Sequence, residues 1–283
     1  MKYVLAISGG VDSVVLLDMV VKNLLPDINV SKKDLIVAHF DHGIRDESSD
    51  DAKFVANLAK KYKLEFISAK GDLSKDASES LARQKRYEFL REVVKEFPPD
   101  GNVKIVTAHH QDDLIETILI NLIRGTGWRG LTPFWADDVI QPLTKMTKAD
   151  IIEYANKNDL TWVDDETNFS NKYLRNRVRN ILTRMTAKQR QQLTQLYNEQ
   201  AKLRKEVEDN VKKITWNNDI LGLPEEVALE ILRKITDGKL TIPQTKRLVK
   251  SLQTAKSGDI LQPGGKIQIG VYKNSLTITK LES

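Results

Sequence analysis

The chain has 283 residues, a formal net charge of +5 and no cysteine. That length can bury one large core or two modest ones, and the lack of cysteine excludes disulfide frameworks and thiolate chemistry within these residues. The opening MKYVLAISGG lacks the apolar run and cleavage site of a signal peptide, and no stretch approaches the ~20 apolar residues of a membrane span. We therefore expect a soluble, cytoplasmic protein that does not bind membranes.

Strand-like and helix-like patterns alternate through residues 1–140. Strands are expected at 2–7, 34–40, 64–70 and 103–109, and helices at 12–25, 46–63, 78–97, 111–124 and 147–158. The last of these helices begins with Thr147 and Asp150 at the spacing of a capping box. Because the strands are almost continuously apolar, we predict a Rossmann-like α/β fold, a parallel sheet with helices on both faces.

The remainder of the chain has a different character. A long charged helix is expected from Ala187 to about Lys213, followed by short helices at 223–235 and 242–253 and two or three small strands within 259–280. We therefore predict an α/β domain at 1–190, a helical linker at 191–215 and a small α+β C-terminal domain at 216–283.

Basic residues are concentrated in one segment, which contains no acidic residue. Its members are Lys172, Arg175, Arg177, Arg179, Arg184, Lys188 and Arg190. Such a segment on a nearly neutral chain suggests a polyanionic partner larger than one nucleotide. A solvated helix face explains the charges equally well, so the charge pattern alone leaves both interpretations open.

The hexapeptide Ser8-Gly9-Gly10-Val11-Asp12-Ser13 stands where the first expected strand becomes a helix. Glycines permit close backbone approach, and the free amides and dipole of a helix start attract anions, so we predict a phosphate site here. It is not a Walker A loop, because no G-x-x-x-x-G-K-[ST] pattern passes through it and no lysine follows the glycines. Asp12 would repel a bare phosphate, which indicates a bridging divalent metal such as Mg²⁺.

All four histidines stand at the ends of two expected strands, His39 and His42 in HFDHG and His109 and His110 in AHHQDD. Carboxyl ends of parallel strands share one edge of a sheet, so these clusters should converge with the glycine turn. A zinc-type His/Asp site and a polar rim that holds a nucleotide and its magnesium are both open. We favour the second, with His39 and Asp41 at the nucleotide, because alternate residues at a strand end point to opposite faces.

Two carboxylates of QDDLIET, Asp113 and Glu116, are three residues apart and therefore share a helix face. Beside an anion site they could hold a cation, either magnesium or an ammonium group, although acidic residues are also common at helix starts. Arg83 lies in the expected helix ESLARQKRYEFL, where it could reach a phosphate or pair with neighbouring acids.

Two further segments combine features of nucleic-acid binding. RGTGWRGL carries Arg124, Trp128 and Arg129 on a glycine-rich loop, which suits an unstacked base, although a plain surface loop fits as well. NKYLRNRVRN spaces three arginines two residues apart. On a helix these fan round the axis, which suits a curved phosphate backbone.

The motif SGGVDS after a first strand resembles the signature of the PP-loop ATP pyrophosphatases. Five further motifs follow in order: HFDHGIR, ESLARQKRY, TAHHQDDLIET, RGTGWRGL and the region from DETN to RNRVRN. With these motifs, residues 1–185 resemble the bacterial tRNA(Ile)-lysidine synthetases. The C-terminal part is weakly similar to the tRNA-binding domain of that family, in its short type.

The resemblance implies a two-step ligase reaction. ATP adenylates the C2 oxygen of the wobble cytidine, position 34, of tRNA(Ile) with anticodon CAU, and free lysine then displaces AMP to give lysidine, which changes decoding from AUG to AUA. The partners implied are this tRNA, free L-lysine, ATP and Mg²⁺, and a homodimer is compatible with the family.

The resemblance also assigns roles to residues. It places ATP at Ser8, Gly9, Gly10, Val11, Asp12, Ser13, His39 and Asp41, with Asp12 on magnesium. Lysine is assigned to Asp113 and Glu116, and catalysis to Asp12, Arg83, Asp113 and Glu116. The tRNA is assigned to Arg124, Trp128, Arg129, Arg175, Arg177 and Arg179.

The chain departs from the family pattern at two places. Thr132-Pro133 follows RGTGWRGL where glycine is usual, and Gln141 replaces an arginine, so position 141 receives no cationic role. Two alternatives remain: another PP-loop tRNA-modifying adenylating enzyme, or a non-catalytic RNA-binding protein that depends on ATP. Two carboxylates in addition to Asp12 favour turnover, because a passive ATP site gains nothing from them.

Overall fold

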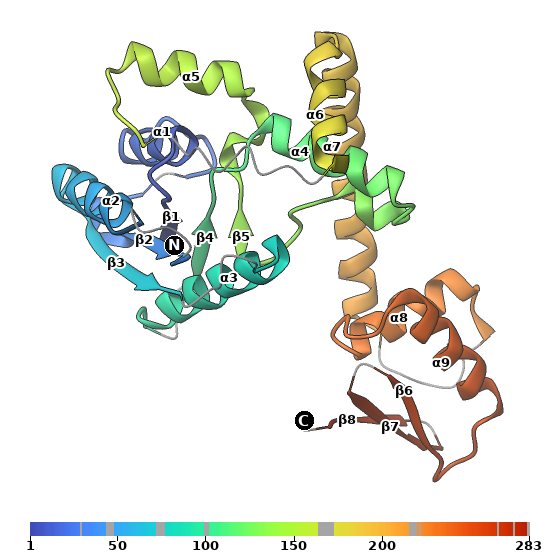
Figure 1. Ribbon diagram of the computed structural model, residues 1–283. Coiled ribbons are helices and arrows are strands. Elements are labelled where there is room, and N and C mark those ends of the chain that lie inside the picture. The colour runs from blue at the N-terminus through green and yellow to red at the C-terminus, as the bar shows by residue number, and fades with distance from the viewer. Residues whose placement is uncertain are drawn as a thin grey trace. The chain divides into compact units, whose positions relative to one another are not determined.

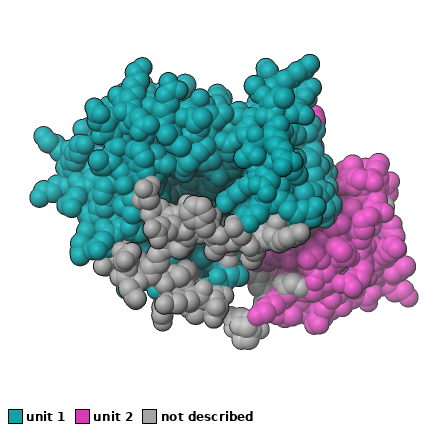
Figure 2. All heavy atoms as spheres, turned by 45° about the horizontal axis from the view of Figure 1, so that its top comes forward, with its two compact units in different colours: residues 1–200 teal, residues 201–283 magenta. Residues whose placement is uncertain are grey.

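The computed structural model describes residues 1–28, 30–43, 48–71, 77–98, 102–163, 173–214, 220, 222–264, 266–273 and 275–281. Within the motifs above, Ile44-Arg45 of HFDHGIR, all of DETN, and Lys172 lie outside the described residues. The chain forms two compact units, Met1–Gln200 and Ala201–Ser283, which Figure 2 separates by colour.

Unit 1 is built on a parallel sheet of five strands. These are β1 (Lys2–Ala6), β2 (Leu35–Asp41), β3 (Glu65–Lys70), β4 (Val103–Val106) and β5 (Val139–Ile140), in the order β3-β2-β1-β4-β5. The parallel sheet is as predicted. Strand β5 was not expected, because a two-residue strand is too short to show a periodic pattern.

Among the described residues, seven helices belong wholly or partly to this unit. They are α1 (Val11–Val21), α2 (Ser48–Tyr62), α3 (Glu79–Lys95), α4 (Gln111–Ile123), α5 (Lys148–Lys157), α6 (Tyr173–Arg184) and α7 (Ala187–Lys212). Short 3-10 turns lie at Lys32–Asp34, Trp128–Leu131 and Pro142–Lys145. Helices α1, α2 and α5 cover one face of the sheet and α3 covers the other, as Figure 1 shows.

Alternation along the central strand explains the two cores. Leu5 of β1 packs with α1, α2 and α5, whereas its neighbour Val4 packs with Leu90 and Val93 of α3. Both β1 side chains are fully buried, and each such side chain stabilises the fold by roughly 1.5–3 kcal/mol. A strand that is buried on both faces reads as a continuous apolar run, which is the pattern of KYVLAI.

The strand order determines which loops meet. Strand β1 lies between β2 and β4. The segments that follow these three strands therefore leave the same edge of the sheet side by side. In Figure 2, the face of unit 1 turned toward the viewer is hollowed.

Unit 2 contains the end of α7, two helices and an antiparallel sheet. Its elements are α8 (Glu225–Ile235), α9 (Ile242–Thr254), β6 (Ile260–Gly264), β7 (Ile267–Tyr272) and β8 (Ser275–Lys280). Lys234 of α8 donates hydrogen bonds to the carbonyls of Val211, Lys212 and Ile214, which closes the C-terminal end of α7 with a cation. Among the described residues, no helix is long and apolar enough to cross a membrane.

Candidate nucleotide site

The glycine turn is held from inside by one hydroxyl. Ser13 Oγ accepts hydrogen bonds from the amides of Ser8 and Gly9, at 3.2 and 3.1 Å, and donates to the Gly10 carbonyl at 2.8 Å. Gly9 has φ +100°, a conformation that L side chains rarely adopt. Ser13 is buried, so in this structure its hydroxyl braces the turn.

The start of α1 is left open for an anion. Gly10 is its N-cap and offers no side-chain cap. The first amides of a helix have no partner within the helix, and they carry the positive end of its dipole. Ser13 Oγ accepts from two amides of the turn, and the Ser13 amide donates to the Gly10 carbonyl, so the amides of Val11 and Asp12 are the donors best placed for a phosphate.

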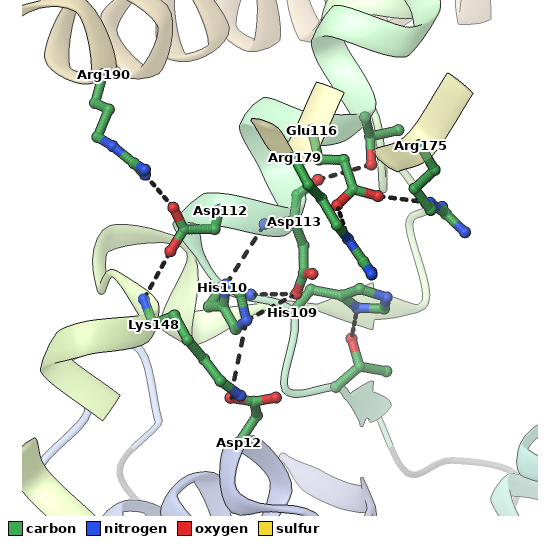
Figure 3. A network of polar contacts seen from close by, with 12 residues as sticks. Asp12, His109, His110, Asp112, Asp113, Glu116, Lys148, Arg175, Arg179 and Arg190 are labelled. Atoms are coloured by element: carbon green, nitrogen blue, oxygen red, sulfur yellow. Dashed lines mark hydrogen bonds and ion pairs between the residues drawn. The ribbon is translucent and has the colours of Figure 1, made fainter. Parts of the chain in front are cut away.

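Asp12, the second residue of α1, pairs with a lysine of α5. Lys148 Nζ donates to Asp12 Oδ1 at 2.5 Å, and both side chains are partly exposed, 41% for Lys148 and 32% for Asp12 (Figure 3). A lysine therefore stands at the glycine turn, although none follows the glycines in the sequence.

Asp112 of α4 ties the start of α5 to α7. Its Oδ2 accepts the backbone amide of Lys148 at 2.7 Å, and its Oδ1 pairs with Arg190, the fourth residue of α7. Burial alone would raise the pKa of Asp112, but the amide of Lys148 and the guanidinium of Arg190 outweigh it and lower the pKa. The carboxylate thus stays charged and holds the two helices in place.

His110 lies between the carboxylates of Asp12, in α1, and Asp113, in α4. It is the N-cap of α4, where its Nδ1 accepts the amide of Asp113 and the Asp113 carboxylate accepts the amide of His110. With Nδ1 an acceptor, a neutral ring carries its proton on Nε2. That nitrogen is 3.5 Å from Asp113 Oδ2 and 3.8 Å from Asp12 Oδ1, so the buried imidazole faces both carboxylates (Figure 3).

Asp113 is the carboxylate with the least complete compensation. Its pKa is raised, because desolvation dominates and the nearby charges of Asp12 and Glu116 add to it, against the opposing effect of His110. An arriving cation would relieve this excess of negative charge. The side chain is 39% exposed, so a ligand can reach it.

Glu116, one turn further along α4, is already paired. Its Oε1 forms an ion pair with Arg175 Nε at 2.5 Å, and its Oε2 accepts a hydrogen bond from Arg179 Nε at 2.9 Å. Arg175 and Arg179 are four residues apart on α6 and share a face. Of the arginines at positions 175, 177 and 179, two therefore contact buried Glu116, and Arg177 is exposed on α6.

A second imidazole, His109, is kept neutral. Burial and the nearby charges of Arg83 and Arg86 lower its pKa to about 3. Arg83 can only donate, so His109 Nε2 accepts from it at 3.4 Å and Nδ1–H donates to Thr107 Oγ1 at 2.8 Å. The ring stacks on Phe134, with centroids 4.4 Å apart.

The remaining predicted residues are placed as follows. His39 is buried and its Nδ1 bonds the Ile7 carbonyl at 2.8 Å, while Asp41 accepts the amide of Gly43 at 2.7 Å, so both have internal partners. Arg124, Trp128 and Arg129 lie beyond the end of α4, where the Arg129 guanidinium stacks 4.8 Å from the Trp128 ring centre.

A magnesium ion fits the donor set only with help from a ligand. Within the described ranges, no three His, Cys, Asp or Glu side chains are grouped to hold a metal ion. Asp12 is the carboxylate at the glycine turn, and Mg²⁺ is commonly held by one or two carboxylates together with substrate phosphates and water. Asp12 therefore fits as the protein ligand of a magnesium–phosphate complex.

Sequence reasoning missed Lys148, Asp112, Arg190 and Phe134, and it left His110 without a role. Histidine is not among the usual N-cap residues, so its capping of α4 gives no signal. Lys148 and Arg190 reach their partners across 136 and 78 residues, distances that no local pattern spans. Phe134 had one signal, the departure from glycine at Thr132-Pro133, and its φ of +65° is unusual for a bulky residue.

Comparison with known proteins places the chain. A family model described as a PP-loop domain matches residues 1–186. The tRNA(Ile)-lysidine synthase of Thermotoga maritima is 37% identical over 182 residues, which is 62% of this chain and 42% of the relative. That of Enterococcus faecalis is 37% identical over 188 residues, 62% of this chain and 38% of the relative. The match thus spans less than half of each relative.

A solved structure shares the fold. The U34-tRNA thiolase NcsA of Methanococcus maripaludis, whose structure holds a [4Fe-4S] cluster, superposes with a TM-score of 0.58 at 18% identity, over 72% of each chain. At this identity the likeness concerns the fold alone. The order of the strands, the glycine turn between β1 and α1, and the match over residues 1–186 agree, and the chain belongs to the PP-loop family.

Proposed function

We propose that this protein is an ATP-dependent ligase that joins free lysine to C2 of the wobble cytidine of a tRNA(Ile) with anticodon CAU. The observation that carries the proposal is the position of His110. Its Nε2 lies within 3.8 Å of Asp12, at the phosphate-binding turn, and within 3.5 Å of Asp113, at a site short of positive charge. The proposed anion site and the proposed cation site are therefore adjacent, as the two-step reaction requires.

The names of the relatives supply the substrate. The relatives that are 37% identical over 182 and 188 residues are named tRNA(Ile)-lysidine synthases, in Thermotoga maritima and Enterococcus faecalis. The region matched in this chain includes the glycine turn and the carboxylates of α4. The rest of each relative has no counterpart in the match, so the complete activity is inferred for this chain from its site.

In the first step, the glycine turn binds the phosphates of ATP. The C2 oxygen of cytidine attacks the α-phosphorus, the bond from that phosphorus to the bridging oxygen breaks, and pyrophosphate leaves with the electron pair. A magnesium ion held by Asp12 would supply charge neutralisation of the phosphates. The amides at the start of α1 would orient the phosphates, and we assign Arg83, which lies beside His109, to the α-phosphate or the base.

In the second step, Asp113 receives the ammonium group of lysine. A carboxylate whose pKa is raised both attracts the cation and is suited to take its proton. The neutral ε-amine then attacks C2, the C2–O bond breaks, and the oxygen leaves with AMP. Glu116 is the second carboxylate of this pair, and in this structure Arg175 and Arg179 hold it.

The tRNA is assigned to the arginines beyond the site and to the small α+β unit. Arg177 is exposed on α6, and Arg124, Trp128 and Arg129 follow α4. We expect Arg177→Ala to weaken tRNA binding and to flatten its salt dependence, because each neutralised phosphate contributes to the slope of affinity against salt. An unchanged slope would remove Arg177 from the tRNA surface.

The test is incorporation of radiolabelled lysine into a tRNA(Ile) transcript with anticodon CAU, in the presence of Mg-ATP, with initiator tRNA(Met) as control. Label in the first RNA alone supports the proposal. AMP formed with a different RNA and no lysine incorporated would indicate another PP-loop tRNA-modifying enzyme. ATP binding without any AMP would indicate a passive RNA-binding protein.

A sulfur-transfer reaction is the alternative that the shared fold suggests. Such enzymes usually carry sulfur on a thiolate or a cluster held by thiolates, and this chain has no cysteine. The lysine incorporation assay separates the two, because a thiolase adds sulfur and leaves lysine in solution.

A further inference from the structure

Lys148 lies at the glycine turn in the structure, although the sequence around the turn contains no lysine. Its ammonium group donates to Asp12 Oδ1 at 2.5 Å, across 136 residues of sequence. Figure 3 shows the side chain reaching from the start of α5 to the start of α1, beside His110. The ammonium therefore stands next to the open helix start where a phosphate would bind.

The main chain of Lys148 is fixed, and only its side chain is free to move. Its backbone amide donates to Asp112 Oδ2 at 2.7 Å. The N-cap Thr147 and Asp150 form a capping box around it. A four-carbon stem on a fixed base can swing its charge by a few ångströms without moving the helix. The ammonium can therefore leave Asp12 for an acceptor that binds beside it.

The turn itself lacks a cation. Ser8 to Ser13 offer amides and hydroxyls, and the one charged side chain among them is Asp12, which is negative. A triphosphate carries several negative charges, and a leaving pyrophosphate gains more at the bond that breaks. In Walker A loops, a lysine that follows the glycines meets this charge. Here the cation beside the turn is Lys148, which belongs to another helix.

We propose that Lys148 binds the β- and γ-phosphates of ATP and stabilises pyrophosphate as it leaves, and that Asp12 is its partner when no nucleotide is bound. The proposal rests on the proposed function only in taking ATP as the substrate. No proton is transferred: the bond between the α-phosphorus and the bridging oxygen breaks, the electron pair goes to pyrophosphate, and the ammonium stays charged throughout.

A purely structural tie between α1 and α5 is the competing explanation, and the chain contains a matched example of one. Lys22, at the other end of α1, pairs with Asp18 at 2.8 Å and donates to Asn158 at the end of α5 at 3.0 Å. Lys22 and Lys148 have similar exposure, 43% and 41%, and both join the same two helices. Only Lys148 lies at the glycine turn.

The test measures binding of ATP, pyrophosphate and AMP by isothermal titration calorimetry to the full chain, for the native protein and for Lys148→Met, Lys148→Arg and Lys22→Met. We expect Lys148→Met to weaken ATP and pyrophosphate about 10- to 100-fold, the loss of one charge-assisted hydrogen bond, and to leave AMP unchanged. Lys148→Arg should recover most of the affinity, and Lys22→Met should bind all three ligands as the native protein does.

Equal weakening of all three ligands, or the same loss in Lys22→Met, would overturn the proposal in favour of a structural tie. If Lys148→Met does not fold, the native protein can be acylated with an amine-reactive reagent instead. Pyrophosphate should protect Lys148 from acylation and AMP should not. Equal acylation of Lys148 with either ligand overturns the proposal. Ligase activity has no part in these measurements. A phosphate effect at Lys148 without lysine incorporation would sink the proposed function alone, and the reverse would sink only the assignment of Lys148.

Discussion

Helix α1 carries two aspartates that both join it to α5, and they differ in almost every other respect. Asp18 is 2% exposed and accepts hydrogen bonds from Tyr62 at 2.6 Å and Tyr154 at 2.7 Å, besides its ion pair with Lys22. Asp12 is 32% exposed, and its close partner in the structure is the single ammonium of Lys148, with His110 further away.

The difference shows how one helix serves both stability and chemistry. Burial would raise the pKa of Asp18, but the three donors outweigh it and lower the pKa, so the charge is fully compensated inside the protein. At the other end, compensation is incomplete, and it is the neighbouring Asp113 whose pKa is raised. Carboxylates that accept from several buried donors hold structure, whereas carboxylates with fewer donors are available to ligands.

The largest expected effect is on stability, at Asp18. Asp18→Ala removes the acceptor of two tyrosine hydroxyls and one ammonium, and breaking such a buried pair costs about 3–5 kcal/mol. Asp12→Ala, the matched change on the same helix, breaks a partly exposed pair worth roughly 0–1 kcal/mol. Urea denaturation followed by circular dichroism measures both. Equal losses of unfolding free energy in the two variants would contradict the difference drawn between Asp18 and Asp12.

The second-largest expected effect is on the rate of the reaction, when Asp12 is replaced. We expect Asp12→Asn to slow RNA-dependent formation of AMP about 10²- to 10³-fold, the usual cost of removing one electrostatic contact to a reacting phosphate or its counter-ion. Its unfolding transition should stay near that of the native protein. Asp27→Asn, an exposed change just after α1, serves as control. Native rates in Asp12→Asn would place this carboxylate outside the chemistry.

Sequence patterns recovered the elements that carry these residues. The strand KYVLAI, the helices on either side of the sheet and the capping box of Thr147 and Asp150 are in the structure as predicted. They could be predicted because apolar periodicity and capping act over a few residues. The predicted anion site at the turn between β1 and α1 rests on the same local rules and stays a prediction.

The partners of the charges could not be predicted in this way. The resemblance assigns Arg175 and Arg179 to tRNA, which stays a prediction; in the structure their Nε atoms lie on Glu116, some 60 residues earlier in the chain. The pairing of Lys148 with Asp12 and the clamp on Asp18 depend equally on tertiary packing. The local sequence determines which side chains lie at the edge of the sheet where β1, β2 and β4 end. The packing of α5 and α6 determines which partners those side chains contact.

Lowering the pH should affect lysine use, through Asp113, and stability, through Asp18, at different pH values. In the proposed reaction Asp113 must be ionised to hold lysine, and its pKa is raised above the ordinary value of 3.8, so KM for lysine should rise as the pH falls through this raised pKa. Asp18 has a lowered pKa, so its contribution to stability is present above pH 3.8 and is lost only as the pH falls below it.

Lysine use is therefore expected to fail at a higher pH than the fold does. Steady-state kinetics and circular dichroism across the same buffers provide the measurement. Asp113→Asn is the control, because it should weaken lysine binding at every pH and remove this part of the pH dependence. Loss of lysine binding that coincides with unfolding would contradict the comparison.

The smallest effect is expected at Lys22, and it tests why the Asp18 clamp is strong. Lys22 is 43% exposed, and Asp18 keeps both tyrosines when the lysine is lost, so Lys22→Met should cost only about 0.3–1 kcal/mol of unfolding free energy. Removal of a tyrosine hydroxyl in Tyr154→Phe should cost about 1–2 kcal/mol, since it leaves a buried carboxylate oxygen with fewer donors. A larger loss in Lys22→Met than in Tyr154→Phe would contradict this. The ion pair with Lys22, rather than the tyrosine hydroxyls, would then stabilise the Asp18 carboxylate and lower its pKa. The double variant then measures the coupling, which should be appreciable because both groups share one carboxylate.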